Sequence, residues 1–317
     1  MRAVTIVDGT VTWAEHPDPE PGTGEVLVRV RAAGLNGADR LQVAGLYPPP
    51  PGAPADIPGL ELAGEVLAVG EGASRFSVGD RVMAVVAGGG QAEQAVVHER
   101  HLLPVPDGLP WEQAGGFPEV FTTAHDALFT QCELQLGERV CVHGAAGGVG
   151  SAGVQLAGAA GARVVATVRD PARHDDVRAL APAGREIVVV DPGDVADHGP
   201  FDVVLELVGA PNLATDLNTL APRGRISVIG VGAGAKAEIN LLDLMNRRGR
   251  IQGSTLRSRS LEDKADAARR VERHVLPLLA SGRVRVPVHA SFPMAEAPAA
   301  YEAFAAGGKL GKIVLTA

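Results

Sequence analysis

The segment from Val140 to Gly161 constrains the fold of this chain more than any other. It opens with Val140-Cys141-Val142-His143, an apolar run short enough for a buried strand. A glycine-rich turn follows at residues 144–150, and then comes a run of small apolar residues at helical spacing, which Gly161 is expected to end as a C-terminal cap. A strand, a glycine-rich turn and a helix in this order are the parts of a dinucleotide-binding unit.

The glycines of this turn have separate physical tasks. Gly147 lets the backbone approach a pyrophosphate without a Cβ in the way, and Gly150 lets the new helix pack close to its strand. Ala145 stands where the usual G-x-G-x-x-G pattern begins, so we expect a residue with a Cβ to make the turn, helped by Gly144. The anion would lie at the helix N-terminus. The predicted cofactor contacts here are Ala146, Gly147, Gly148 and Val149. A surface turn is the alternative, but the flanking strand and helix favour nucleotide binding.

Length and charge narrow the class of protein. A chain of 317 residues is long enough for two domains. No apolar run approaches the roughly 18 residues that span a membrane. A formal net charge of −8 without a basic cluster argues against nucleic-acid binding. Residues 1–7 are expected to form a strand and not a signal peptide, which favours a cytoplasmic location.

The first hundred residues are predicted to be rich in β-structure. Asp8-Gly9 is typical of a two-residue hairpin. Valines alternate with other residues over 26–30, as in a half-buried strand. Further strands are expected at 62–69, 81–86 and 92–97. The proline run between Tyr47 and Gly52 is too rigid for a helix or a strand and must form an exposed loop. Short strands with glycine-containing turns suggest a partly open barrel.

From Val140 onward, predicted strands and helices alternate, which implies a parallel sheet with helices on both faces. The expected strands are 163–167, 187–190, 201–207, 225–229 and 250–256. A long charged helix is expected over 260–279. Beyond it the chain returns to a β-rich pattern, with a strand at 284–288, a helix at 295–306 and a strand at 311–315. The simplest architecture is a nucleotide domain inserted between two parts of a barrel-like domain.

Several short motifs are similar to those of one known family. They are Asn36-Gly37-Ala38-Asp39, Gly45-Leu46-Tyr47, Pro58-Gly59-Leu60-Glu61, Gly79-Asp80-Arg81-Val82, Pro118-Glu119 with Thr123-Ala124, the glycine turn, and Gly311-Lys312-Ile313-Val314. Together they resemble the zinc-free quinone oxidoreductases of the medium-chain dehydrogenase/reductase family, which are related to zeta-crystallin. The resemblance extends over nearly the whole chain.

This resemblance implies an α/β fold with two domains. A GroES-like, β-rich catalytic domain would span 1–117 and 283–317, and a doubly wound parallel-sheet Rossmann domain would span 118–282. The family also implies NADPH as the hydride donor, a cleft between the domains and a homodimer built through the last Rossmann strand. Zinc-dependent relatives carry a cysteine in place of Asn36, a histidine in place of Leu60 and a four-cysteine lobe. With only Cys132 and Cys141 in the chain, we expect no metal.

Hydride transfer needs mainly positioning, because the cofactor supplies the reactive hydrogen. By resemblance, the predicted catalytic residues are Tyr47, Asn36 and Thr123. The Tyr47 hydroxyl would donate to the acceptor oxygen, although its ring could instead stack on the neighbouring prolines. Asn36 would orient water or substrate, or else form a turn beside Gly37. Thr123 would lie beside the nicotinamide, or bond its own helix backbone.

The end of the second Rossmann strand carries Arg169, where an enzyme that uses NAD would place an acid. Arg169 and Arg173 are therefore predicted to clamp the 2′-phosphate of NADPH, with solvated helix charge as the alternative. Asp191 stands where many relatives carry a tyrosine, and its carboxylate would repel the phosphate unless an arginine intervenes.

Other cofactor contacts are predicted from strand ends and from the resemblance. Ligands of doubly wound sheets bind at the carboxyl ends of the strands, which selects Val208, Gly209, Ile229 and Gly230. The resemblance adds Leu256, Arg257, Lys309 and Glu119, with a helix-start carboxylate as the alternative for Glu119. Structural roles are expected for His143, for Glu61 as a brace of a buried turn, and for Asp39 as the cap of a helix at 40–43.

Three functions remain open at this level. The first is an NADPH-dependent reductase of quinones, and the second is a reductase of alkenals, enones or enoyl substrates that uses the same residues with a different pocket shape. The third is an NADPH-binding structural protein like the crystallins. In each case the expected partners are a small molecule and a second copy of the chain, and no nucleic acid or membrane.

Overall fold

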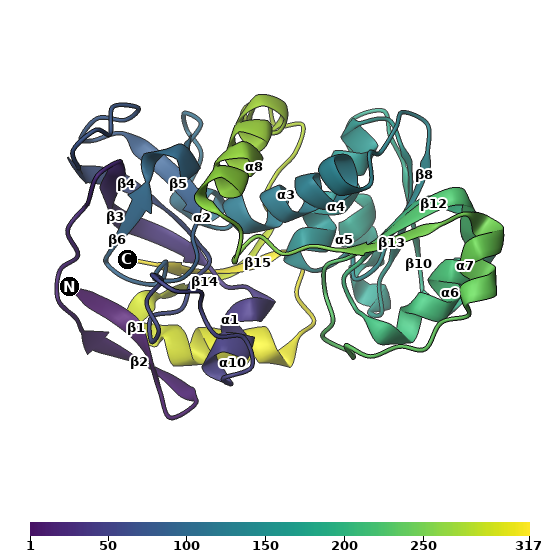
Figure 1. The fold of residues 1–317 in the computed structure, drawn as a ribbon, viewed down its shortest axis with the longest axis horizontal. Helices are drawn as coiled ribbons and strands as arrows, with labels where there is room; N and C mark the ends of the chain where they lie inside the picture. Colours follow the sequence, from purple (N-terminus) through teal and green to yellow (C-terminus); the bar gives the residue numbers. More distant parts are fainter. The chain divides into compact units, whose positions relative to one another are not determined.

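The computed structural model describes residues 1–317, and the chain divides into two compact units (Figure 1). The first unit comprises residues 1–122, 256–280 and 286–317, and the second comprises residues 123–255 and 281–285. The first is β-rich and the second contains a parallel sheet. The predicted α/β fold class, with a β-rich domain and a domain built on a parallel sheet, is confirmed.

A seven-stranded sheet is the centre of the first unit. Its strand order is β14-β15-β3-β4-β5-β7, and β6 pairs with β3. The strands are β3 (Glu25–Gly34), β4 (Glu61–Val69), β5 (Arg81–Val85), β6 (Gln94–His98), β7 (Leu102–Pro104), β14 (Val288–Pro293) and β15 (Lys312–Thr316). A separate hairpin, β1 (Arg2–Val7) and β2 (Thr10–Glu15), turns at Asp8-Gly9, where both residues have positive φ. Alternate residues of β3 enter the core, as the valine pattern predicts.

Six helices accompany or border this unit. They are α1 (Gly37–Val43), α2 (Trp111–Gly115), α3 (Pro118–His125), α8 (Leu261–His274), α9 (Leu276–Ala280) and α10 (Ala297–Ala306). Helices α2 and α3 are separated at Phe117-Pro118, since the residue before a proline disfavours the helical conformation. Past α3 the chain continues as a π-helical stretch over Asp126–Gln131.

Six parallel strands form the sheet of the second unit. They are β8 (Arg139–Val142), β9 (Arg163–Thr167), β10 (Ile187–Val190), β11 (Phe201–Glu206), β12 (Leu220–Val228) and β13 (Arg250–Gly253). The order β10-β9-β8-β11-β12-β13 reverses between β8 and β11, and doubly wound sheets bind their ligands at such a switch point. The helices are α4 (Gly148–Ala159), α5 (His174–Arg178), α6 (Leu213–Asn218) and α7 (Leu241–Arg247).

The structure differs from the expected domain division chiefly at the segment 256–280, which belongs to the first unit. Residues 118–122 also belong to the first unit, and residues 283–285 belong to the second. The small apolar face of α8, with Ala265, Ala268 and Val271 buried, packs in that unit. Two ion pairs, Arg75 with Glu272 and Arg100 with Glu262, tie the outer part of α8 to the same unit. The sequence predicted a long charged helix here, but it contained no information about which unit the helix packs against.

Several other elements differ in their limits. Strand β12 begins at Leu220, five residues earlier than expected, and β13 ends at Gly253 and not at residue 256. The helix expected over 260–279 ends at His274 and resumes as α9, whose second residue, Pro277, cannot donate a backbone hydrogen bond. The strand expected at 284–288 begins only at Val288. Before it, the Arg285 N–H donates to Gln155 Oε1 at 2.8 Å and not to a neighbouring strand. None of the helices has the length and apolar character to cross a bilayer.

Candidate functional site

The glycine turn between β8 and α4 has the geometry of an anion-binding loop. Gly147 is the N-cap residue of α4, and the N–H groups that begin this helix have no partner within it. A Cβ on Gly150 would lie 2.4 Å from the Gly144 carbonyl oxygen, so only glycine lets α4 approach the strand this closely. Ala145 does not make the turn as expected. Gly144 does, with φ at +62°, while Ala145 is fully buried.

The predicted 2′-phosphate clamp lies at the carboxyl end of β9. Arg169 is exposed and forms no ion pair or hydrogen bond within the protein, whereas Arg173 pairs with Asp176 at 3.0 Å. Asp191 lies 3.9 Å from the His174 ring nitrogen Nε2, which also bonds the Val168 carbonyl oxygen at 3.0 Å. The Asp191 carboxylate, which would repel a phosphate, thus has the His174 imidazole beside it. Arg169 is the cation that remains available to bind an anion.

The segments after β11 and β12 lie side by side in the sheet. Val208 and Gly209 follow β11, and Ile229 and Gly230 follow β12. Gly209 has φ at +115°, and a Cβ on Gly230 would lie 2.3 Å from the Leu207 carbonyl oxygen. Both positions therefore require glycine. Because β8, β11 and β12 are parallel neighbours, the four residues lie at the same edge of the sheet as the glycine turn.

A buried ionic cluster lies beneath this edge. His143 Nε2 lies 2.8 Å from Asp216 Oδ1 and 3.9 Å from Glu206 Oε2, and Nδ1 lies 3.0 Å from Thr167 Oγ1. All four residues are at most 2% exposed. Although burial alone lowers it, hydrogen bonds to Asp216 and Cys141 raise the pKa of His143 to about 11, so the ring is a cation at neutral pH. The expected structural role of His143 agrees with this position.

In the first unit, Asn36 belongs to a buried network centred on an ammonium group. Lys312 Nζ donates to Leu35 O at 2.7 Å and to Asn36 Oδ1 at 2.7 Å, and it lies 2.6 Å from Glu61 Oε1. The Asn36 amide nitrogen donates to the same Glu61 oxygen at 3.0 Å. Glu61 Oε2 accepts from the Glu119 N–H at 2.9 Å, which fixes the start of α3. Glu61 does brace a buried region, as expected, and it does so through Lys312.

The residues at this position do not fit a zinc ion. Zinc in proteins is held by thiolate, imidazole and carboxylate ligands. At the two positions where zinc-dependent relatives would carry a cysteine and a histidine, this chain has Asn36 and Leu60, and the Lys312 ammonium contacts Asn36. Both cysteines are buried in the second unit.

Asp39 has a different place in its helix than the sequence suggested. Helix α1 begins at Gly37 with Asn36 as the N-cap residue, so Asp39 is the third residue of the helix and accepts from the Asn36 N–H at 2.8 Å. It is fully buried, and its second oxygen has no hydrogen-bond partner. Desolvation raises the pKa of Asp39 to about 7, against the lowering effect of that hydrogen bond.

Arg257 holds the backbone of the Tyr47 loop. Its buried guanidinium donates to Ala87 O at 2.7 Å, to Tyr47 O at 2.9 Å and to Gln42 Oε1 at 2.5 Å, and it lies 5.0 Å from the centre of the Tyr47 ring. The Arg257 side chain, which was predicted to contact the cofactor, thus binds the backbone of the Tyr47 loop. The Tyr47 hydroxyl, by contrast, makes no hydrogen bond within the protein, and burial raises its pKa.

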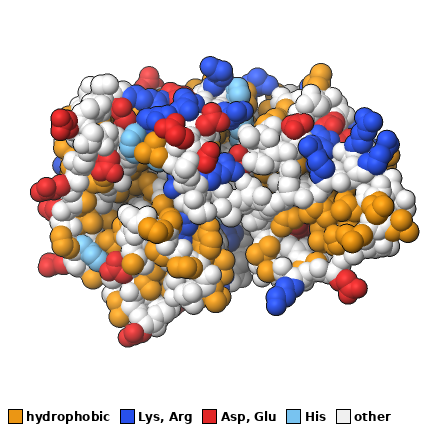
Figure 2. Space-filling model, in the orientation of Figure 1, with side chains coloured by type: hydrophobic (Ala, Val, Ile, Leu, Met, Phe, Trp, Pro, Cys, Tyr) orange, Lys and Arg blue, Asp and Glu red, His pale blue; other side chains and the backbone are white.

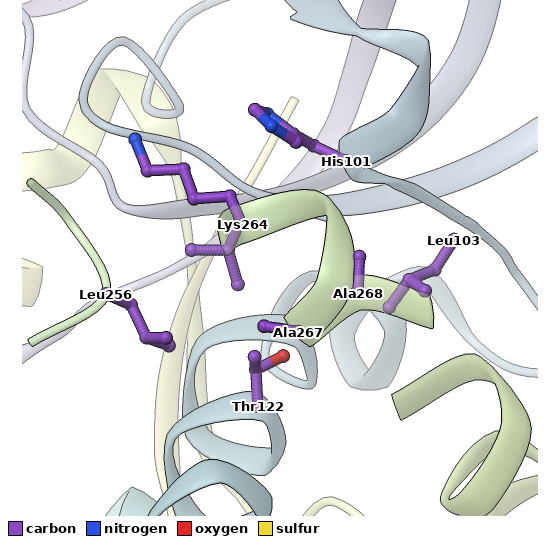
Figure 3. Close-up of a pocket in the computed structure, with 8 residues that line it drawn as sticks. His101, Leu103, Thr122, Leu256, Lys264, Ala267 and Ala268 are labelled. Carbon is purple, nitrogen blue, oxygen red and sulfur yellow. The ribbon is translucent and has the colours of Figure 1, made fainter. Parts of the chain in front are cut away.

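The remaining predicted residues occupy varied positions. Glu119 lies at the start of α3 and Thr123 is buried in the same helix. The Lys309 ammonium lies 3.8 Å from the Phe304 ring centre. Leu256 is buried and lines a small cavity under α8 (Figure 3) with Thr122, Lys264 and Ala267. The cavity measures about 20 Å³, the room of one water molecule, so it is not a site for a ring-shaped substrate.

Within each unit, the structure brings together residues that the sequence selected separately. The second unit gathers the glycine turn, Arg169, Val208 and Ile229 at one sheet edge, and the first joins Asn36 to Lys312 and Tyr47 to Arg257. Sequence reasoning missed the buried partners Glu206 and Asp216. The signal that could have revealed Glu206 is a carboxylate directly after the apolar run Val203-Val204-Leu205, two residues before Val208.

Comparison with known proteins agrees with this geometry. Residues 22–107 match the family described as alcohol dehydrogenase GroES-like domain, and residues 184–315 match the family described as zinc-binding dehydrogenase. A quinone oxidoreductase of Pseudomonas aeruginosa is 34% identical, with 96% of this chain and 94% of the relative covered. An erythronolide synthase of Saccharopolyspora erythraea is 37% identical over 97% of this chain. The matched region makes up only 8% of that much longer protein.

Solved structures show the same relationship. The quinone oxidoreductase of Thermus thermophilus, determined alone and in complex with NADPH, superimposes with a TM-score of 0.86 at 34% identity, and both chains are covered completely.

Proposed function

Since the chain belongs to the quinone oxidoreductases of the medium-chain dehydrogenase/reductase family and is an oxidoreductase, we propose that it transfers hydride from NADPH to a quinone-type acceptor without a metal ion. The observation that carries the proposal is the glycine turn at the switch point of the parallel sheet, with the unpaired Arg169 at the next strand end. NADPH would supply the hydride, and the protein would bind and orient the cofactor and the acceptor.

The preference for NADPH is supported by the state of the two arginines. Arg169 has no protein partner, so its guanidinium can form charge-assisted hydrogen bonds with a 2′-phosphate. Arg173 would have to share its charge with Asp176. Of the two, Arg169 is therefore the residue on which discrimination between NADPH and NADH should depend.

Binding measurements with both nucleotides test this assignment. We expect Arg169→Ala to weaken NADPH binding roughly tenfold, the value of one charge-assisted interaction, and to leave NADH binding unchanged. Arg163→Ala, an exposed arginine at the opposite end of β9, is the matched control. Equal loss of both nucleotides in Arg169→Ala, or equal affinity of the native protein for both, would contradict the clamp.

On the acceptor side, the Tyr47 hydroxyl is the group proposed to donate to the developing oxyanion of the acceptor. It has no protein partner, and Arg257 holds its loop in place. Tyr47→Phe keeps the ring and removes only the hydroxyl, so we expect kcat with the best acceptor to fall about tenfold, at unchanged NADPH affinity. The second tyrosine of the chain, Tyr301, is buried against Gln91 and provides Tyr301→Phe as the control. An unchanged kcat in Tyr47→Phe would remove the hydroxyl from the mechanism.

An enone, alkenal or enoyl acceptor is the second candidate, and the match to part of a polyketide synthase supports keeping it. Both acceptors take hydride and leave an oxygen whose negative charge must be stabilised. NADPH oxidation against an ortho-quinone, a para-quinone and a 2-alkenal distinguishes the two. Turnover of the 2-alkenal alone would replace the quinone proposal, and turnover of none would favour the third prediction, an NADPH-binding structural protein.

A homodimer is part of the proposal. Strand β13 is an edge strand of its sheet, and α7 beside it exposes Leu241, Leu242 and Met245 by 59–70%. Figure 2 shows hydrophobic side chains gathered on the right of the molecule, where Figure 1 places α7. We expect sedimentation to show a dimer that Met245→Glu dissociates, while Leu136→Glu, which alters another exposed leucine of this unit, does not. A cytoplasmic location stays a prediction.

A further inference from the structure

Three of the four residues of the buried cluster in the second unit, all but Asp216, come just before a segment predicted to bind the cofactor. His143 directly precedes the glycine turn, Thr167 stands two residues before Arg169, and Glu206 stands two residues before Val208. The His143 ring joins the three strand ends, because Nδ1 pairs with Thr167 Oγ1 at 3.0 Å and Nε2 faces Glu206 Oε2 at 3.9 Å. The cluster therefore links β8, β9 and β11 at the switch point of the sheet.

Glu206 makes the closest contacts to the predicted cofactor segments. One carboxylate oxygen, Oε1, accepts from the Val208 N–H at 2.5 Å and from the Gly209 N–H at 2.6 Å. The Glu206 backbone carbonyl accepts from the Ile229 N–H at 2.9 Å and from the Gly230 N–H at 3.1 Å. A single residue thus fixes both segments.

The side chain of Glu206 is itself fixed from behind. Oε2 accepts from Asn212 Nδ2 at 3.0 Å, and the His143 cation lies beyond it. The carboxylate is 1% exposed, so water cannot replace any of these partners. Hydrogen bonds to a carboxylate are stronger than those to a neutral acceptor, and a buried network in which each donor is satisfied is rigid.

We propose that Glu206 is a positioning residue of the cofactor site, which holds the Val208–Gly209 segment in its binding conformation with His143 as its buried counter-ion. The proposal rests on the proposed function, because it assigns these segments to the cofactor. Glu206 does not touch the cofactor and acts only through the two backbone N–H groups. Gly209 has φ at +115°, a conformation that residues with a side chain rarely adopt.

A metal ion is the competing occupant of this cluster. One ligand atom from each of His143, Glu206 and Asp216 lies within 4.8 Å of the others. The direct contact of 2.8 Å between His143 Nε2 and Asp216 Oδ1 is that of a hydrogen bond, and Glu206 Oε1 is already shared by two N–H donors. The arrangement fits a proton on the imidazole better than an ion between the three groups.

Three variants of the full chain test the assignment. Glu206→Ala removes the acceptor, Glu206→Gln keeps a carbonyl oxygen in its place, and Val204→Ala makes a cavity in the same strand without touching the segment. The first readout is amide hydrogen exchange of Val208 and Gly209 in the cofactor-free protein. The second is NADPH affinity, and the third is metal content after dialysis against a chelator.

We expect Glu206→Ala to lose protection at both amides and to bind NADPH at least about tenfold more weakly, as for the loss of a hydrogen bond to a charged group. Glu206→Gln should keep the protection and lie within about threefold of the native affinity, and Val204→Ala should behave likewise. Unchanged exchange in Glu206→Ala, equal losses in Val204→Ala, failure of glutamine to rescue, or one retained metal ion per chain would each overturn the proposal. If the native protein binds no NADPH, the proposed function fails, while the exchange experiment still decides the role of Glu206.

Discussion

Each unit contains a buried ionic network, and the two networks balance their charges differently. In the first unit, the three N–H donors of the Lys312 ammonium meet three acceptors, namely Leu35 O, Asn36 Oδ1 and Glu61 Oε1. In the second, the His143 cation serves two carboxylates, and Asp216 Oδ2 is buried without a hydrogen-bond partner. The first network is matched donor for acceptor, whereas the second carries excess negative charge.

This difference determines how each network should respond to substitution. A matched pair loses heavily when either member is removed, because the other stays behind as an uncompensated buried charge. A network with an unmatched carboxylate loses less, because some of its members have other partners. Without the imidazole, Glu206 retains three donors, from Val208, Gly209 and Asn212. Without Lys312, Glu61 retains only two, from Asn36 and Glu119. The comparison therefore predicts a graded series of effects on the free energy of unfolding.

Lys312→Met should have the largest effect. It leaves Glu61, which is fully buried, without its cation, and we expect a loss of about 3–5 kcal/mol in the free energy of unfolding, measured with urea. Adding Glu61→Leu to this variant removes the stranded charge and should recover part of the loss. If Glu61→Leu lowers the free energy of unfolding of Lys312→Met by as much as it lowers that of the native protein, the two residues are not coupled.

His143→Gln should cost less, about 1.5–3 kcal/mol, the value of hydrogen bonds to charged groups. The loss should also depend on pH. The pKa of His143 is raised in the folded protein to about 11, from 6.5 in the unfolded chain, so its stabilising effect is complete below about pH 6.5 and disappears as the pH rises toward 11. Urea unfolding of both proteins at pH 6, 8 and 10 should show the difference shrinking. A constant difference would mean that the ring is not a cation in the folded state.

The parts of these networks differ in how far the sequence predicts them. The glycine turn and the alternation of strands and helices are local patterns, and the parallel sheet followed from them. Contacts between distant residues left no such trace. Lys312 and Asn36 are 276 positions apart, and they meet because β15 pairs with the end of β3. Arg257 was predicted to contact the cofactor from the family resemblance, but the direction of its side chain toward Tyr47 depends on how the two loops meet.

Asp39 tests whether the first network has room for a second carboxylate. It adjoins Asn36 but has no cation of its own, and its pKa is raised to about 7, from 3.8 in the unfolded chain. An acid with a raised folded-state pKa loses stabilisation as the pH rises between the two values. We therefore expect Asp39→Asn to gain stability relative to the native protein between pH 4 and pH 7, as followed by urea unfolding. Parallel stability curves would show that Asp39 is ionised throughout.

The smallest effect is expected for Asp216→Asn, and its counterpart in the first unit sharpens the comparison. The amide oxygen of asparagine can still accept from His143, and the unmatched negative charge is removed, so we expect a change within about 1 kcal/mol. Glu61→Gln makes the same chemical change in the first unit. It leaves the Lys312 ammonium without its counter-ion, and it turns an amide N–H toward the Glu119 N–H. Its loss in the free energy of unfolding should therefore be several times larger. If the two variants lose equally, the networks are balanced alike, and the unpaired Asp216 oxygen has a partner in solution, such as a buried water.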